Sequence, residues 1–218
     1  MISLRRLVAY HECGHVIAAS VWAATPPSAV TIVKNGDSRG RVLRPYVFEH
    51  DPSLPKWLQR TIALGEVRTL LGGYAAEEVL AGKPPPDVAH ALGGEVDLLA
   101  CKPLDLDDLY FALLRLRHAY PHGSVAVRFR RLARHYRHVV AFLSVHRTVL
   151  DAAAAKLLRE QMIVLVGARL REVVPARIAR RGGAAGWMID HGMPRPQKVT
   201  RADRPQLLDG LADDRRRA

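Results

Sequence analysis

The first long apolar stretch of the chain runs from residue 3 to about residue 24. It contains no proline, and Gly14 is its only interior glycine. A run of this length and composition predicts an α-helix with little exposed surface. Ser3 is a suitable N-cap residue, and Thr25-Pro26-Pro27 ends the run.

Two short segments with strand character follow this helix. Residues 29–33 are rich in β-branched side chains, and residues 40–44 alternate apolar and basic side chains before Pro45. Asn35-Gly36-Asp37 between them is typical of a turn. The pattern predicts a β-hairpin or small sheet beside the first helix.

The rest of the chain up to residue 181 is mainly helical in pattern. Gly72-Gly73 within the second helix indicates close helix packing, and 84–103 is a loop-rich insertion with one turn of helix at 96–101. The predicted helices cover residues 56–81, 105–119, 124–150 and 151–174, with a break near 148–150.

The fold class is therefore mostly α with a small N-terminal β-hairpin or sheet. We expect one domain over residues 1–181. Residues 182–218 are rich in Gly, Pro, Arg and Asp, and this composition predicts a flexible basic tail.

Charge and cysteine content narrow the class of protein. The net charge is +12, and residues 115–181 hold 15 basic against 3 acidic side chains. Such a face could meet nucleic acid, an acidic protein or an anionic membrane. No aromatic-interleaved pattern accompanies it, so we interpret it as a solvated surface.

The remaining bulk properties favour a cytoplasmic protein. Two cysteines, Cys13 and Cys101, provide no disulfide framework. The longest apolar run, residues 16–24, is under half of the ~20 residues needed to span a bilayer. We expect a reducing compartment and no membrane span.

The first helix contains the strongest chemical signal, His11-Glu12-Cys13-Gly14-His15. Residues four apart lie on one face of a helix, so His11 and His15 can both direct ring nitrogens at one zinc ion. Glu12 lies beside them, where a carboxylate can take a proton from a water that zinc has acidified. The pattern predicts a zinc hydrolase with His11 and His15 as ligands and Glu12 as the base.

A catalytic zinc needs a third protein ligand as well as an open position. Spacing alone does not choose between glutamate and aspartate, and Cys13 points away from the histidine face. The candidates are Glu77, Glu78, His90, Asp97, Asp107 and Asp108.

Several motifs, in order, resemble the peptidase domain of FtsH-type ATP-dependent zinc proteases. Residues 9–15, Ala-Tyr-His-Glu-Cys-Gly-His, resemble its zinc motif, and residues 30–33 and 40–42 its substrate-side strands. Residues 71–78 resemble its Gly-Gly-Arg-x-Ala-Glu-Glu segment, and residues 107–112 its Asn/Asp-Asp-Leu-x-x-Ala segment. The resemblance covers about residues 7–172.

This resemblance implies roles for particular residues. Asp108 is implied as the third zinc ligand, with Asp97 as its rival, and Glu77 as a group that orients a ligating histidine. An extended substrate is expected to add to the strand at Arg41-Val42-Leu43.

The expected function is that of a zinc-dependent endopeptidase acting on a polypeptide. The chain contains no Gly-x-x-x-x-Gly-Lys-Ser/Thr phosphate loop, so we expect no ATP binding and no ATPase module in it. It would then cut unfolded chains, or chains delivered by a separate unfoldase or adaptor. Two alternatives stay open: a specialised protease of one regulatory partner, and an inactive scaffold that binds protein or nucleic acid through the basic helices.

Overall fold

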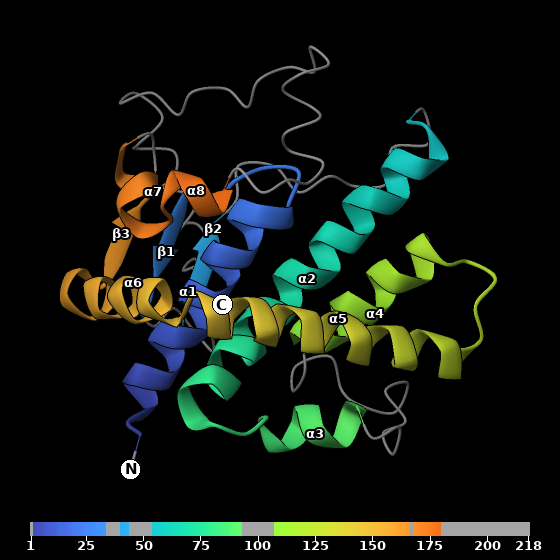
Figure 1. Cartoon of the computed structure of the whole chain (residues 1–218), viewed down its shortest axis with the longest axis horizontal. Coiled ribbons are helices and arrows are strands. Elements are labelled where there is room, and N and C mark those ends of the chain that lie inside the picture. Colours follow the sequence, from blue (N-terminus) through green and yellow to red (C-terminus); the bar gives the residue numbers. More distant parts are fainter. Residues whose placement is uncertain (1, 34–39, 44–53, 93–106, 166–167, 180–218) are drawn as a thin grey trace, which may run out of the picture.

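The computed structural model describes residues 2–33, 40–43, 54–92, 107–165 and 168–179. It confirms the predicted class, mostly helical with one small sheet (Figure 1). The helices are α1 Leu4–Trp22, α2 Lys56–Ala81, α3 Pro86–Leu92, α4 Asp107–Ala119, α5 Val125–Val145, α6 Arg147–Glu160, α7 Ala168–Val173 and α8 Ala176–Ala179. The strands are β1 Ala29–Thr31, β2 Arg41–Leu43 and β3 Met162–Val164.

Helix α1 is the central element of the fold. The Ser3 hydroxyl caps its first turn by accepting from the Arg6 N–H at 3.4 Å. In Figure 1 it lies between α6 and the sheet on one side and α2 on the other. From Ala9 onward nearly every residue is buried, so its polar side chains face other protein groups.

Glycines allow α1 and α2 to cross in backbone contact. A Cβ on Gly14 would collide with the Gly72 carbonyl oxygen, and a Cβ on Gly72 would lie 2.6 Å from the Gly14 oxygen. A Cβ on Gly65 would collide with the Trp22 carbonyl in the same way. The close crossing brings the predicted zinc helix within reach of backbone atoms of α2.

The sheet has the order β2-β1-β3 and is antiparallel throughout. Val30 of β1 pairs with Val42 on one side and with Ile163 on the other. The sequence predicted only the first of these pairings, as a hairpin. The sheet therefore joins segments about 130 residues apart.

The prediction of one helix over residues 151–174 is wrong. Helix α6 ends at Glu160 because Gln161 takes a left-handed conformation with φ 60°, and the β-branched pair Ile163-Val164 continues as β3. A run of only three strand residues has no period that could separate it from a helix.

Smaller differences concern helix limits. The break after α5 falls at His146, whose φ and ψ are not helical, rather than at 148–150. Part of the insertion 84–103 forms α3, and α4 begins at Asp107. The predicted turn at 35–37, the helical turn at 96–101 and the tail 182–218 lie outside the described residues.

Within the described residues, none of the helices combines the length and the apolar character that crossing a bilayer requires.

His135 is a buried histidine of α5 that should make the fold sensitive to acid. It is 9% exposed and accepts a hydrogen bond from Arg68 Nε at 3.4 Å. Burial, together with the charges of Arg68 and neighbouring cations, lowers its pKa to about 4. Between pH 6.5 and 4 the unfolded chain therefore binds a proton that the folded chain does not. The free energy of unfolding should fall over this window by at most about 3 kcal/mol.

Urea unfolding at pH 7 and pH 4.5 tests this. The variant His135→Gln keeps an acceptor for Arg68 but has no charge to gain, so it should lose less stability than the parent. His122→Gln removes an exposed histidine and serves as the control. Equal losses in the parent and His135→Gln would contradict the prediction.

Candidate metal centre

Helix α1 places His11 and His15 one turn apart with their rings facing each other edge to face. The ring centroids are 4.7 Å apart, and the two Nε2 atoms are 3.0 Å apart. This is the arrangement that the i, i+4 spacing predicts for one helix face. The two imidazoles therefore direct the same ring nitrogen to a common point.

The other ring nitrogen of each histidine is engaged by α2. His11 Nδ1 lies 2.6 Å from Glu77 Oε1, and His15 Nδ1 lies 2.7 Å from the Thr69 carbonyl oxygen. Both partners are acceptors, so each Nδ1 donates its hydrogen, and in the neutral ring Nε2 keeps the lone pair. Metal-binding histidines are held in this way, with the free nitrogen fixed in tautomer and direction.

Asp108, in the first turn of α4, completes the cluster. Its Oδ2 lies 3.1 Å from His15 Nε2 and 3.3 Å from His11 Nε2. Among the described residues, His11, His15 and Asp108 are the group of potential metal ligands whose donor atoms converge. Helix α4 packs against α2, which is why residue 108 reaches side chains of residues 11 and 15.

The spacing of these three atoms fits zinc. Tetrahedral zinc with ligands at about 2.0–2.1 Å separates neighbouring ligand atoms by about 3.3 Å. The three separations here are 3.0, 3.1 and 3.3 Å. Asp108 keeps 25% of its side chain exposed, so solvent reaches the cluster from one side.

The electrostatics of the cluster favour a positive charge at its centre. Burial opposes the charged form of His11, but hydrogen bonds to Asp108 and Glu77 outweigh it and raise the pKa to about 10. Burial likewise opposes the Asp108 carboxylate, yet the two histidines hold its pKa well below the usual range. This pKa places a proton on His11 when no metal is bound, and a metal ion would take the place of that positive charge between the two rings and the carboxylate.

Glu12 lies beside the cluster without belonging to it. It is 7% exposed, and burial raises the pKa of its carboxyl group while His15 and His11 oppose that rise. A Cβ on Gly40, the residue before β2, would lie 2.6 Å from Glu12 Oε1. The carboxylate is therefore held between the histidines and the start of β2, and its raised pKa makes it a better proton acceptor.

Gly73 is a functional residue that the sequence reasoning missed. A Cβ at this position would lie 2.5 Å from His11 Nε2 and 2.6 Å from His15 Nε2. The pair Gly72-Gly73 indicated helix packing, but only Gly72 serves that purpose. Thr69 was also missed, because it acts through its carbonyl oxygen and any residue type provides one.

The structure separates the other candidate ligands. Glu77 contacts the far nitrogen of His11, and Glu78 instead lies beside the Tyr136 hydroxyl. Cys13 is fully buried away from the cluster, and its pKa is raised by burial. Asp97 and the side chains of His90 and Asp107 lie outside what the structure describes.

Residues 3–97 match the family model described as peptidase family M41. The chain is 40% identical over 81 residues to an ATP-dependent zinc metalloprotease FtsH of Trieres chinensis, which covers 37% of this chain and 12% of that protein. It is 37% identical over 102 residues to an ATP-dependent zinc metalloprotease FtsH of Methylibium petroleiphilum, 44% of this chain and 16% of that protein. The resemblance inferred from the motifs is thereby confirmed.

The family match covers His11, Glu12, His15 and Glu77, whereas Asp108 lies beyond it. The chain spans less than a fifth of the length of these relatives.

Proposed function

We propose, on the premise that residues 3–97 are a peptidase domain of the M41, FtsH-like type, that this chain is a zinc-dependent endopeptidase. Its substrates are polypeptides that are unfolded or delivered by a partner, such as a separate unfoldase or adaptor. The similarity to zinc metalloproteases supports hydrolysis of peptide bonds as the reaction.

The observation that carries this proposal is the convergence of His11 Nε2, His15 Nε2 and Asp108 Oδ2 with both Nδ1 atoms already engaged. These three residues would hold the zinc, and Glu77 would orient His11. Bound zinc supplies a Lewis acid that polarises a carbonyl group and lowers the pKa of water to about 7.

Glu12 is the proposed proton carrier. Its carboxylate accepts a proton from the attacking water and later gives it to the leaving amine. The raised pKa suits this task, because a group that both takes and returns a proton works best when its pKa is near the working pH. The histidines beside it oppose that rise.

Strand β2 is the proposed site for the substrate backbone. It pairs with β1 along one edge, and none of the described strands pairs with its other edge. An extended peptide added there would be bound through main-chain hydrogen bonds, which tolerate many sequences. Residues Arg41, Val42 and Leu43 follow directly on Gly40, so such a peptide would pass beside Glu12.

Zinc content and cleavage measured together test this proposal. Protein purified without chelators or a histidine tag should contain about one zinc per chain and cut a permanently unfolded protein substrate. Asp108→Ala should lose the zinc and the activity, because two histidines alone bind zinc weakly. Asp97→Ala, the matched variant at the rival position, should keep both.

Loss of zinc from Asp97→Ala with retention in Asp108→Ala would assign the third ligand to Asp97. A parent protein that takes up no zinc would contradict the proposed function.

A further inference from the structure

Tyr74 of α2 lies against the ring of His11. The centroids of the two rings are 5.2 Å apart, and the ring planes are at 90° to each other. Aromatic rings attract each other in this edge-to-face arrangement at centroid distances of about 4.5–7 Å. Tyr74 is neither a proposed zinc ligand nor the partner of an Nδ1 atom, so this contact is additional to the hydrogen bonds that hold the histidines.

The plane of the His11 ring needs a restraint of this kind. A hydrogen bond through one ring nitrogen fixes the direction of that nitrogen, but the ring can still turn about the bond. His15 is the more enclosed of the two histidines, with 11% of its side chain exposed against 18% for His11. Glu77, which holds His11 Nδ1, is itself 16% exposed. The orientation of His11 therefore depends more on its neighbouring rings.

Three residues of one α2 segment surround the His11 ring. Gly73 leaves room for it, since a Cβ there would lie 2.5 Å from His11 Nε2. Glu77 Oε1 lies 2.6 Å from His11 Nδ1, and Tyr74 supplies the ring contact. The same segment therefore sets the position, the tautomer and the plane of this imidazole.

Helix α5 holds this segment of α2 in place. Tyr136 is 2% exposed, and its hydroxyl donates to the Tyr74 carbonyl oxygen at 3.3 Å. The same hydroxyl lies beside Glu78. The backbone that carries the Tyr74 ring is consequently fixed by a buried side chain of another helix.

We propose that Tyr74 is a positioning residue, whose ring sets the plane of the His11 imidazole and so the direction of its Nε2 lone pair. The proposal rests on the zinc site of the proposed function. Arginine stands at the corresponding place in the Gly-Gly-Arg-x-Ala-Glu-Glu segment that residues 71–78 resemble, so the aromatic ring is a feature of this chain. Tyr74 acts through His11 and needs no contact with the substrate.

Replacing Tyr74 by leucine in the full chain tests the proposal. Cobalt(II) bound in place of zinc absorbs visible light, and the strength of this absorption depends on the geometry of the ligands. Tyr74→Leu should change the absorption per bound cobalt. It should also weaken zinc binding about tenfold, because groups that orient a ligating histidine contribute about 10–100-fold to metal affinity. A merely structural role of the ring would lower stability toward urea and leave the absorption per cobalt unchanged.

Tyr74→Phe is the conservative variant, since it keeps the ring and removes only the hydroxyl. Its cobalt absorption should match that of the parent, and its zinc affinity should stay within about threefold. Equal changes in Tyr74→Phe and Tyr74→Leu would assign the effect to the hydroxyl and overturn the proposed role of the ring.

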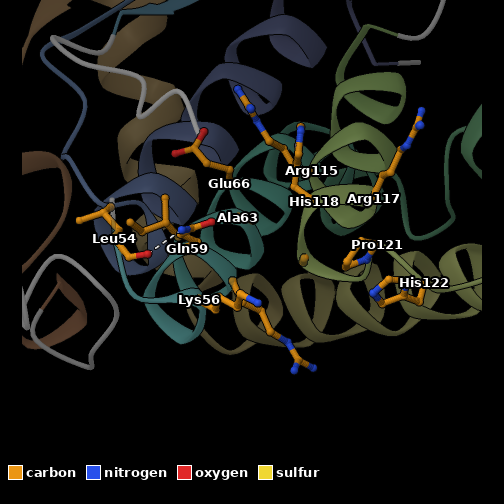
Figure 2. Close-up of a pocket in the computed structure, with 13 residues that line it drawn as sticks. Leu54, Lys56, Gln59, Ala63, Glu66, Arg115, Arg117, His118, Pro121 and His122 are labelled. Carbon is orange, nitrogen blue, oxygen red and sulfur yellow. Dashed lines mark hydrogen bonds between the residues drawn. The ribbon is translucent and has the colours of Figure 1, made fainter. Parts of the chain in front are cut away.

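Tyr120→Leu is the matched control, because Tyr120 is another partly buried tyrosine that packs against α2. Its ring centroid lies 4.4 Å from the guanidinium of Arg60, a residue about 21 Å from Tyr74 along the helix axis. The next residue, Pro121, lines a cavity of about 660 Å³ between the start of α2 and the end of α4 (Figure 2). None of the residues that line this cavity belongs to the metal cluster. Tyr120→Leu should therefore leave cobalt absorption and zinc affinity unchanged.

The outcomes separate this proposal from the proposed function. Unchanged absorption and zinc affinity in Tyr74→Leu would overturn the role of Tyr74 and leave the endopeptidase proposal standing. A parent that binds metal but cuts no polypeptide would contradict the endopeptidase, while the cobalt absorption would still decide the role of Tyr74. A parent that binds neither zinc nor cobalt would overturn both.

Discussion

Glu12→Gln should abolish peptide cleavage while zinc stays bound. The amide keeps the size of the side chain but cannot accept the proton of the attacking water, and general base catalysis contributes roughly 10²–10⁴-fold to a rate. Zinc should remain because Glu12 lies outside the ligand cluster. The measurement is the rate of cleavage of an unfolded substrate at pH 7, with zinc per chain determined on the same sample.

The matched control for this variant is Glu160→Gln, the same change at an exposed carboxylate of α6 that pairs with Lys156. Its rate should equal that of the parent. Cleavage retained in Glu12→Gln would exclude Glu12 as the base. A zinc-loaded parent that cuts no substrate at all would instead favour the inactive binding scaffold.

Gly73→Ala should reduce zinc affinity by about 100-fold or more, although no ligand is changed. The new methyl group would lie 2.5 Å from His11 Nε2 and 2.6 Å from His15 Nε2, so both rings must turn away from their shared point. Turning them also breaks the hydrogen bonds to Glu77 and Thr69, and loss of such partners alone costs about 10–100-fold in metal affinity. Competition with a chelator of known affinity measures the change.

Gly123→Ala provides the comparison for this substitution. A Cβ on Gly123 makes only ordinary contacts, the nearest at 3.4 Å, so zinc affinity should equal that of the parent. Circular dichroism should show that Gly73→Ala remains folded, because the two imidazole rings can move toward the solvent-accessible side of the cluster. Unchanged zinc affinity in Gly73→Ala would show that the histidines bind no metal in this arrangement.

The long helices could be predicted because their signals are local. The predicted limits of 56–81 agree with α2, and Ser3 caps α1 as expected. Strand β3 could not be predicted, since it exists through hydrogen bonds to a strand that lies about 130 residues earlier. Its three residues carry no pattern of their own.

The residues of the candidate site also differ in whether a local sequence pattern could predict them. His11, Glu12 and His15 follow from one helical spacing, which needs no knowledge of the rest of the chain. Asp108 required a family resemblance, because its position depends on how α4 packs against α2. The role of Gly73 could not be predicted from the sequence. Only the positions of the two imidazole rings show that no side chain fits at residue 73.

The long-range closure of the fold also has a consequence for synthesis on the ribosome. The Tyr10 hydroxyl of α1 donates to Asp151 at 2.7 Å, and β1 pairs with β3 at residue 162 and beyond. Synthesis proceeds at about 5–20 residues per second, so these partners emerge on the order of ten seconds after α1. During that interval the nascent chain exposes an apolar helix that contains two histidines. We therefore expect chaperones to bind the growing chain at α1 until α6 and β3 have emerged.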